Sequence, residues 1–414
     1  MKTLRRFTGY ALLLLARLYL FPIYLVSGFV PRRDDLWVFG SWGGYRFADN
    51  SAAFFNYCQE KVSDRIRLVW ISREKHIVEQ LSARGVEAHW IWSPRGIGCC
   101  LRAGLYLFDS FSKDINFWTC RGARRINLWS GVPLKAFERD IATRDSRYYR
   151  LFHGTWPERA LLSVMMPWHV HRPHMIIATS PETARITDRA FDLEPDVSVV
   201  TGYPRNDVLF GSGSAVDASV PPAFQDALNG GRHVFMYLPT YRDSGAAYFD
   251  VDWAELDELM DSVNGSFFFK FHPDDESTFC GKGHHVHELE QGSDIYRLMA
   301  MTNTLISDYS SIIFDFMLLE RAIVYYMPDL ADFSSSSRSL IFDPQQIAVG
   351  PVCHDGKQML SALRDAASGS AIDDDRDAQW SAIRRRFNTY TDGQSCKRVL
   401  DVIDRRFLDG RLTN

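Results

Sequence analysis

Three short polar stretches in the second half of the chain carry residue types that suit the binding of phosphate. The first has Thr240 and Arg242 in L-P-T-Y-R-D, the second has His272 in K-F-H-P, and the third has Ser310 and Ser311 in S-D-Y-S-S. A guanidinium offers a planar fork of donors for phosphate oxygens. An imidazole donates as well and can transfer a proton near neutral pH. Together the three stretches predict a phosphate-binding site.

Each of these stretches directly follows an apolar run that is typical of a buried strand. The runs are H-V-F-M-Y-L, S-F-F-F and T-L-I-S, and amphipathic segments alternate with them. This alternation predicts β-α-β units and a parallel sheet, in which the carboxyl ends of the strands share one edge, so the loops are expected to converge. Because I-I-F-D-F begins a helix, Ser310 and Ser311 are expected at its N-terminus, where free N–H groups and the helix dipole attract an anion.

For each of these residues taken singly, a structural role is the simpler interpretation. Paired serines commonly serve only as a helix cap, Arg242 suits a surface ion pair, and His272 suits a satisfied loop position. The combination at equivalent strand ends is what favours a ligand site. The chain has neither G-x-x-x-x-G-K-[ST] nor G-x-G-x-x-G after a strand, which argues against a P-loop ATPase and a typical dinucleotide enzyme.

The composition narrows the class of protein further. The chain has 414 residues, enough for two domains, and 46% of them are hydrophobic. A formal net charge of −4 does not indicate nucleic-acid binding. The seven cysteines form no C-x-x-C pair and the twelve histidines show no metal-ligand spacing, so we expect reduced thiols, no metal site and no cofactor.

The order of apolar runs and amphipathic segments predicts an α/β protein with two domains. We expect an N-terminal domain over residues 35–212 and a C-terminal domain over residues 213–414, which includes the last helices. Ligand sites at strand ends of both halves predict a cleft between the domains. The glycine-rich loop in V-F-G-S-W-G-G-Y, with Gly43 and Gly44, is either a tight turn or a loop that faces this cleft.

Residues 1–34 are expected to associate with a membrane. Basic residues precede a long apolar stretch that Arg17 and Pro22 interrupt. Because a charge at the bilayer centre costs roughly 2.5–3.5 kcal/mol on insertion scales, an interfacial helix is favoured, with Arg17 snorkelling to the headgroups. A spanning helix and a buried core helix are the second and third alternatives, and the broken apolar run argues against a signal peptide.

Several sequence elements resemble one family. The elements S-D-Y-S-S-I-I-F-D-F-M-L-L-E-R-A-I-V-Y-Y-M-P-D-L, L-P-T-Y-R-D, K-F-H-P, T-G-Y-P-R-N-D and L-W-S-G-V-P-L-K-A-F are similar to those of CDP-glycerol glycerophosphotransferases, which include the teichoic acid primases and polymerases. Their order and spacing also match, and the likeness covers roughly residues 36–335. The resemblance implies two Rossmann-like domains of the glycosyltransferase-B type, facing a cleft.

The resemblance also implies roles for individual residues. The donor would lie in the C-terminal domain, where its diphosphate would be held by Thr240, Arg242, His272, Ser310 and Ser311. Asp315 would face inward near them and serve the ribose, while Asp308 would brace the loop. On the acceptor side the implied residues are Gly43, Gly44 and Lys135, although Lys135 also suits a solvated surface position.

One position departs from the family pattern. The family has a histidine after the tryptophan, thought to act as the base, where this chain has Ser130. A serine hydroxyl is no base at neutral pH. His153, Asp49 or a substrate phosphate is an alternative proton acceptor, and His272 and Ser130 remain catalytic candidates. A different acceptor or donor, or weak catalysis, would also account for the serine, and a loose transition state needs little help from a base.

Three functions follow as hypotheses. The first is a membrane-associated transferase on the cytoplasmic side that moves glycerol phosphate from CDP-glycerol to a lipid-linked or polysaccharide acceptor, of the teichoic-acid or capsule type, and releases CMP. The second is a transferase that uses another CDP-polyol, such as CDP-ribitol, or a nucleotide sugar. The third is a non-catalytic nucleotide-binding partner of a glycan assembly complex, which Ser130 motivates.

Overall fold

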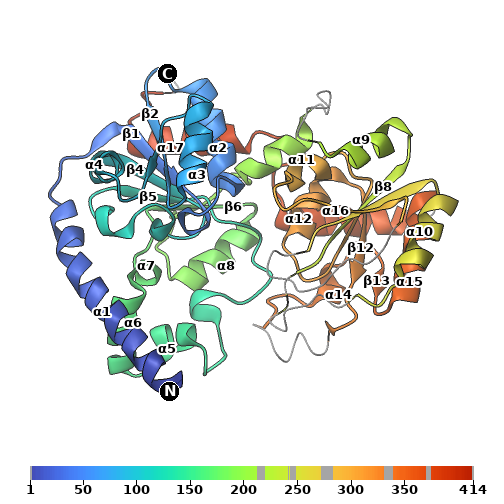
Figure 1. The fold of residues 1–414 in the computed structure, drawn as a ribbon, viewed down its shortest axis with the longest axis horizontal. Helices are drawn as coiled ribbons and strands as arrows, with labels where there is room; N and C mark the ends of the chain where they lie inside the picture. The colour runs from blue at the N-terminus through green and yellow to red at the C-terminus, as the bar shows by residue number, and fades with distance from the viewer. Residues whose placement is uncertain are drawn as a thin grey trace. The chain divides into compact units, whose positions relative to one another are not determined.

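The computed structural model describes residues 2–211, 220–240, 242, 249–271, 283–330, 339–369 and 374–412. The chain divides into two compact units, each built around its own parallel sheet (Figure 1). The first unit comprises Met1–Gly131, Phe137–Arg205 and Gln394–Asn414, and the second comprises Val132–Ala136 and Asn206–Gly393. The α/β class expected from the sequence is therefore present in both halves.

The first unit contains a seven-stranded parallel sheet in the order β3-β2-β1-β4-β5-β6-β7. Its interior strand β1 is buried on both faces, since Trp37, Val38 and Phe39 are each 0% exposed. In the register of the sheet, Val38 pairs with Val69 on one side and Tyr106 on the other. The strands are β1 (Arg33–Gly40), β2 (Arg67–Ser72), β3 (Ala88–Trp90), β4 (Ala103–Phe108), β5 (Arg124–Asn127), β6 (Met175–Ala178) and β7 (Ser198–Val200).

Helices connect these strands and cover the sheet. Helix α2 packs on β1, α3 on β2 and α8 on β6. The helices of this unit after the N-terminal one are α2 (Asp49–Lys61), α3 (Lys75–Ala83), α4 (Pro94–Arg102), α5 (Arg147–His153), α6 (Trp156–Met165), α7 (Pro167–Val170), α8 (Pro181–Phe191) and α17 (Ser395–Phe407). Four single-turn 3₁₀ helices lie between them: η1 (Trp42–Gly44), η2 (Ser112–Asp114), η3 (Phe117–Thr119) and η4 (Glu138–Asp140).

Helix α17 belongs to the first unit, whereas residues 213–414 were expected to form one C-terminal domain. Figure 1 shows the red α17 beside the blue α2, and the two helices are in contact. Its buried side chains include Val399 and Ile403, which are both 0% exposed. An amphipathic helix must bury its apolar face somewhere, but its sequence does not say against which sheet.

The second unit contains a six-stranded parallel sheet in the order β10-β9-β8-β11-β12-β13. The strands are β8 (His233–Leu238), β9 (Gly265–Phe269), β10 (Val286–Glu288), β11 (Thr304–Ser307), β12 (Ala322–Tyr326) and β13 (Val352–Cys353). Its helices are α9 (Pro222–Asn229), α10 (Trp253–Ser262), α11 (Ile295–Met299), α12 (Ile312–Phe316), α14 (Pro344–Ile347), α15 (Gly356–Ser368) and α16 (Asp374–Phe387), with the 3₁₀ turn η6 (Met317–Leu319). Large aromatic side chains of β8, β9 and β12 fill its core, among them Tyr237, Phe267 and Tyr326.

The N-terminal segment forms one helix, α1 (Lys2–Ser27), with Pro22 inside it. Much of its apolar surface is exposed, including Leu12 at 68% and Tyr19 at 80%, while Tyr24 is buried and stacks on Phe117 at 4.9 Å. In the described part of the chain no helix is both long and apolar enough to cross a bilayer.

The expected snorkelling of Arg17 to lipid headgroups is not what the structure shows. Its guanidinium lies 4.8 Å from the ring centre of Trp168 and 5.6 Å from that of Trp118. Burial, with a further contribution from Arg73, lowers the pKa of Arg17. The guanidinium is thus engaged in cation–π contacts with tryptophans of two other segments.

Candidate functional sites

The strand order creates one crossover point in each sheet, where ligands of open parallel sheets usually bind. In the first unit β1 lies between β2 and β4, and in the second β8 lies between β9 and β11. At such a point the loops after the two central strands turn to opposite faces of the sheet and leave a crevice outside their carboxyl ends. A ligand is therefore expected next to the residues directly after β1 and β4, or after β8 and β11.

In the second unit the loops after β8 and β11 meet at Asp308. The Thr240 hydroxyl donates to Asp308 Oδ1 at 2.6 Å, and the Thr240 backbone N–H donates to the same oxygen at 2.9 Å. The Arg242 guanidinium donates to Asp308 Oδ2 at 2.8 Å. Asp308 thus braces this edge of the sheet and joins two of the three loops that the sequence singled out.

Two carboxylates contact the Arg242 guanidinium, so its paired N–H donors are already engaged in this structure. Besides Asp308 it contacts Asp329, which follows β12, at 2.6 Å from Nε. Burial alone would lower the pKa of Arg242, but Asp308 and Asp329 outweigh burial and raise it. The side chain of Asp329 is 15% exposed and that of Asp308 only 1%, so an incoming anion meets Asp329 first.

Ser310 and Ser311 precede helix α12, as expected from the sequence. Both are partly exposed. The Ser310 hydroxyl accepts only a long hydrogen bond of 3.4 Å from the Ile312 N–H, and the Ser311 side chain makes no capping bond. Helix α12 has five residues before it continues as η6, so its dipole is smaller than a long helix would supply. The two hydroxyls keep donor capacity that capping does not use.

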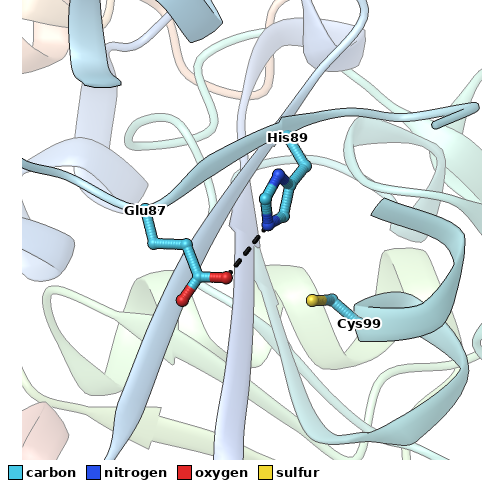
Figure 2. Close-up of side chains that lie close together, drawn as sticks. All are labelled: Glu87, His89 and Cys99. Atoms are coloured by element: carbon cyan, nitrogen blue, oxygen red, sulfur yellow. Dashed lines mark hydrogen bonds and ion pairs between the residues drawn. The ribbon is translucent and has the colours of Figure 1, made fainter. Parts of the chain in front are cut away.

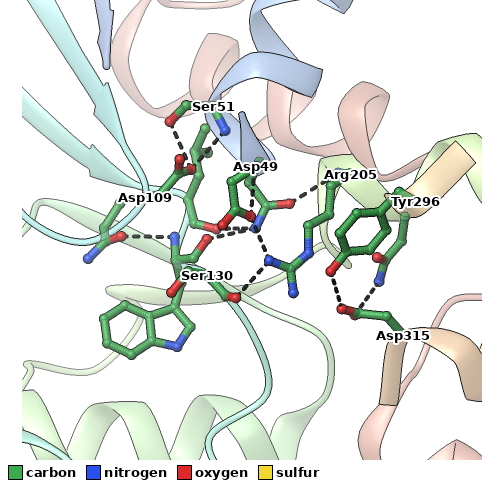
Figure 3. A network of polar contacts seen from close by, with 12 residues as sticks. Asp49, Ser51, Asp109, Ser130, Arg205, Tyr296 and Asp315 are labelled. Atoms are coloured by element: carbon green, nitrogen blue, oxygen red, sulfur yellow. Dashed lines mark hydrogen bonds and ion pairs between the residues drawn. The ribbon is translucent and has the colours of Figure 1, made fainter. Parts of the chain in front are cut away.

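Asp315 does not lie open for a ribose hydroxyl. It is 0% exposed and accepts hydrogen bonds from Asn206 Nδ2 at 2.8 Å and from the Tyr296 hydroxyl at 2.7 Å (Figure 3). The Asp315 side chain therefore ties α11 and α12 to the start of the second unit, because a buried polar group needs such partners. His272, the remaining donor-side prediction, lies outside the described residues.

The crossover point of the first unit is lined by a second polar network, drawn in Figure 3. Asp109, directly after β4, accepts from both the N–H and the hydroxyl of Ser51, each at 2.8 Å. The Asp49 carboxylate binds Arg205 at 2.5 Å, and Arg205 also donates to the Ser130 carbonyl at 2.7 Å. The junction of β1 and α2 is thereby connected to the loop after β5.

Two residues of this network have backbone conformations that side chains rarely adopt. Asp49 has a φ of 64° and Trp129 has a φ of 48°. The Asn50 side chain donates to the carbonyls of Leu128 and Trp129, at 3.0 and 2.7 Å, and so fixes both turns. Strain of this kind persists where surrounding contacts enforce it and is concentrated at functional sites.

Two buried carboxyl groups of the first unit have raised pKa values. Burial, followed by the charges of Asp49 and Asp114, raises the pKa of Asp109 well above its ordinary value. Burial also raises the pKa of Asp114 to about 6. Asp109 Oδ2 has no hydrogen-bond partner among the described residues. Sequence reasoning missed both groups, although an aspartate directly after a buried strand, as in L-F-D-S, was a usable signal.

Gly43 and Gly44 form the tight turn η1 after β1. Their φ values are 66° and 87°, which glycine adopts without strain. The Gly43 N–H donates to Asp114 at 2.9 Å, and the Gly44 carbonyl accepts from the Ser72 hydroxyl at 2.8 Å. The turn accounts for both glycines and places them at the same sheet edge as Asp114.

The catalytic candidates Ser130 and His153 and the third acceptor-side candidate, Lys135, lie in different places. Ser130 is in the network described above. His153 ends helix α5, and its Nε2 lies 2.7 Å from the Arg139 carbonyl, so its hydrogen-bond partner is η4 and not the loop of Ser130. Lys135 belongs to the segment Val132–Ala136, which is part of the second unit and forms an antiparallel bridge with Leu340.

One cluster resembles a metal site in composition. Glu87, His89 and Cys99 bring an oxygen, a nitrogen and a sulfur within 4.8 Å of one another (Figure 2). However, Arg67 donates to both Glu87 oxygens, at 2.9 and 2.6 Å. Burial raises the pKa of the Cys99 thiol, which disfavours the thiolate that a metal requires. The cluster is therefore an ion-pair network around Arg67.

Comparison with known proteins gives a family and a fold. The family model for CDP-Glycerol:Poly(glycerophosphate) glycerophosphotransferase matches residues 23–405. A teichoic acid poly(glycerol phosphate) polymerase of Bacillus spizizenii is 22% identical over 94% of this chain and 97% of its own. A teichoic acid glycerol-phosphate transferase of Staphylococcus aureus is 25% identical over 90% and 94%, and a B. spizizenii teichoic acid ribitol-phosphate primase is 26% identical over 92% and 93%.

Solved structures share the architecture. The wall teichoic acid polymerase TagF superposes with a TM-score of 0.75 at 18% identity, over 99% of this chain and 98% of that chain. A UDP-N-acetylglucosamine 2-epimerase superposes with a TM-score of 0.56 at 11% identity, over 92% and 97%. At these identities the likeness identifies the fold, an α/β architecture with two parallel sheets.

Proposed function

The chain belongs to the CDP-glycerol:poly(glycerophosphate) glycerophosphotransferase family, and from this premise we propose that it transfers glycerol phosphate from CDP-glycerol to a lipid-linked or polysaccharide acceptor of a surface glycan. Family membership over residues 23–405, together with the curated teichoic acid relatives, makes the chain a transferase and not merely a binding partner. The products of the proposed reaction are a phosphodiester and CMP.

The contact of Thr240 and Arg242 with Asp308 is the observation that carries the donor assignment. It gathers two of the family's sequence elements at the crossover point of the second sheet. In the proposed complex, the donor's diphosphate binds between Arg242 and the free hydroxyls of Ser310 and Ser311. The phosphates compete with the more exposed Asp329 for the guanidinium, whereas Asp308 stays bound and keeps its orientation.

The chemistry is an in-line displacement at the phosphorus that carries glycerol. The acceptor oxygen forms a bond to this phosphorus, the bond to the CMP oxygen breaks, and the hydroxyl proton leaves the acceptor. Ser130 supplies no base, Asp49 is bound to Arg205, and His153 is bound to the Arg139 carbonyl. His272, the other catalytic candidate, lies outside the described residues. We propose that the phosphoryl oxygens take the proton, so that catalysis rests on positioning and on neutralisation of charge.

The acceptor side is assigned to the first unit. The support is the strained, buried network of Asp49, Asn50 and Arg205 at the crossover point between β1 and β4. The exposed apolar residues of α1, including Leu12 and Tyr19, support a peripheral location on the cytoplasmic face of the membrane, where a lipid-linked acceptor is accessible.

A CDP-ribitol donor is the second candidate, because ribitol enzymes are among the relatives at similar identity. The B. spizizenii ribitol-phosphate primase is 26% identical, and the S. aureus ribitol-phosphate polymerase TarK is 25% identical over 57% of this chain. Comparison of thermal shifts with CDP-glycerol, CDP-ribitol, CMP and UMP separates these donors. Equal shifts from CMP and UMP would contradict a cytidine pocket.

The decisive assay measures CMP after incubation of the full chain with CDP-glycerol and a lipid extract. We expect CMP release that depends on the extract and increases with enzyme concentration. Absence of CMP with both CDP-glycerol and CDP-ribitol, at a protein concentration at which either nucleotide shifts the melting temperature, would contradict the transferase assignment.

A further inference from the structure

A cavity in the first unit shares no residue with the two strand-end sites. Its volume is about 420 Å³, and η4 and helices α5, α6, α7 and α8 contribute its walls. Three arginines line it, against one glutamate. Its lining includes Glu138, Arg139, Phe152, Trp156, Arg159 and Arg172.

The cavity is built around a buried hydrogen-bonded pair of side chains. Glu138 binds His169 Nδ1 through both oxygens, at 2.9 and 3.1 Å, and the two side chains are only 7% and 6% exposed. The His169 ring also packs on Phe111, with the ring centres 4.3 Å apart. His153 supports the same turn by its contact with the Arg139 carbonyl. These contacts hold the cavity open as a formed site.

The three arginines differ in how their charge is compensated. Arg139 contacts Asp192 at 3.2 Å, and Arg172 contacts the same carboxylate as well as Glu194 at 3.9 Å. Asp192 thus orients two guanidinium groups at one wall. The side chain of Arg159, on α6, has no hydrogen bond or ion pair to any described residue, so its charge is available to a ligand.

Apolar side chains lie next to this charge. Phe152 stacks under the Arg139 guanidinium at 5.2 Å, and Trp156 is 79% exposed. Helix α6 also packs against α1, where Leu14 joins the cluster of Leu151 and Met165. The cavity therefore adjoins the exposed apolar surface of α1 and α6, which includes Leu12, Leu15, Leu18, Tyr19, Leu161 and Val164.

We propose that this cavity binds the phosphodiester headgroup of an anionic membrane lipid. Arg159 and Arg139 receive the phosphate, Trp156 lies at the level of the headgroups, and the acyl chains continue along the apolar surface of α1 and α6. The inference rests on the membrane association proposed above, and it adds a defined site to what would otherwise be adsorption of an apolar helix. A pocket that presents the guanidinium of Arg159, unpaired among the described residues, beside an apolar surface matches both parts of such a lipid.

The first test uses a soluble lipid, so that it does not depend on a membrane. The full chain is titrated with dihexanoylphosphatidylglycerol below its critical micelle concentration, with dihexanoylphosphatidylcholine and inorganic phosphate as comparisons. We expect saturable binding of the phosphatidylglycerol, weakened about tenfold in Arg159→Ala, which removes one charge-assisted contact. Arg144→Ala, a change of equal charge at an exposed residue outside the cavity lining, is expected to bind like the wild type.

The second test measures co-sedimentation with vesicles of phosphatidylcholine alone or with phosphatidylglycerol. We expect stronger binding to the anionic vesicles and loss of that preference in Arg159→Ala but not in Arg144→Ala. Arg159 is exposed and alanine favours helices, so this variant is expected to fold; an unchanged melting temperature checks this.

The two tests separate the two proposals. Binding of the soluble lipid without binding to any vesicle would support the cavity and contradict membrane association. Equal effects of Arg159→Ala and Arg144→Ala on soluble-lipid binding would overturn the cavity assignment, as would equal affinity for the phosphatidylcholine. Inorganic phosphate that binds as tightly as the lipid would show a free-phosphate site instead.

Discussion

The guanidinium of Arg242 donates to the carboxylate of Asp308 across 2.8 Å, and this buried contact joins the loop after β8 to the loop after β11. The pair lies where the strand order of the second sheet reverses, with Asp329 as a second, more exposed partner of the arginine. In the proposed donor site, the more exposed carboxylate of Asp329 would give way to the donor's phosphate, while Asp308 stays bound to Arg242.

Replacement of Arg242 tests this arrangement. Arg242→Ala leaves Asp308 buried without its cation, which is expected to cost about 3–5 kcal/mol of the free energy of unfolding. CMP release is expected to fall by about a hundredfold or more. Urea denaturation and the CMP assay measure the two effects. Arg242→Lys keeps the charge without the fork, so a variant as active as the wild type would contradict the assignment.

Introduction of a histidine at position 130 tests the missing base. The backbone there is held by the contact of Arg205 with the Ser130 carbonyl, so Ser130→His is expected to present an imidazole without moving the loop. A positioned base contributes roughly 10²–10⁴-fold, and we expect at least a tenfold rise in CMP release at pH 7.5. The pH profile of CMP release should also show a new transition at about 6.5, the ordinary pKa of histidine. Ser82→His, on exposed α3, is the control, and an unchanged rate in both variants would contradict the prediction.

The raised pKa of Asp109 predicts that the protein becomes less stable as the pH rises. Its pKa is raised in the folded state, so the folded protein binds the proton more tightly than the unfolded chain does. The contribution of Asp109 to the free energy of unfolding is therefore fully present below the unfolded pKa of about 3.9, and it is lost as the pH rises through the folded pKa.

The variant Asp109→Asn mimics the neutral acid and keeps an acceptor for Ser51. We expect its melting temperature to exceed that of the wild type by a few degrees at pH 8 and to differ little at pH 4.5, as scanning calorimetry would show. Asp64→Asn, at an exposed residue, serves as the control. A wild type that gains stability relative to Asp109→Asn with rising pH would contradict the raised pKa.

Replacement of Gly44 by alanine tests how closely the turn after β1 is packed. An added Cβ would lie 3.0 Å from the Arg73 side chain and 3.2 Å from the Asp114 carbonyl, at a φ of 87°. Gly85 has a φ of 77° but nothing within 4 Å of such a Cβ. Both alanine variants bear the left-handed strain of about 1–2 kcal/mol. We expect Gly44→Ala to lose more stability than Gly85→Ala in urea denaturation; equal losses would show that crowding plays no part.

The loops of the proposed donor site could be predicted from the sequence, because their positions depend on the order of residues along the chain. Apolar runs that end in Thr240-x-Arg242 and Asp308-x-Ser310 predict strands with polar ends, and the parallel connection brings such ends to one edge. The identities of these residues also sufficed for the family resemblance, which the match over residues 23–405 confirms.

The hydrogen-bond and ion-pair partners of individual side chains could not be predicted from the sequence in this way. Arg242 meets Asp329 from a third strand, Asp315 is sealed by Asn206 and Tyr296, and His153 binds a carbonyl of η4. Each contact joins residues distant in the chain, so no periodicity or motif reports it. The position of Arg17 could not be predicted for the same reason, because it depends on contacts with two tryptophans of other segments.

By itself the sequence determined the family, the alternation of strands and helices, and which loops follow the strands of the second sheet, because these follow from residue order and local propensity. Tertiary structure alone decided that α17 packs in the first unit, that 132–136 joins the second, and that Asp109 and Asp114 share a buried edge with Asp49. These outcomes depend on which apolar surfaces pack together and on how far water is excluded from a carboxyl group, and both are properties of the folded chain.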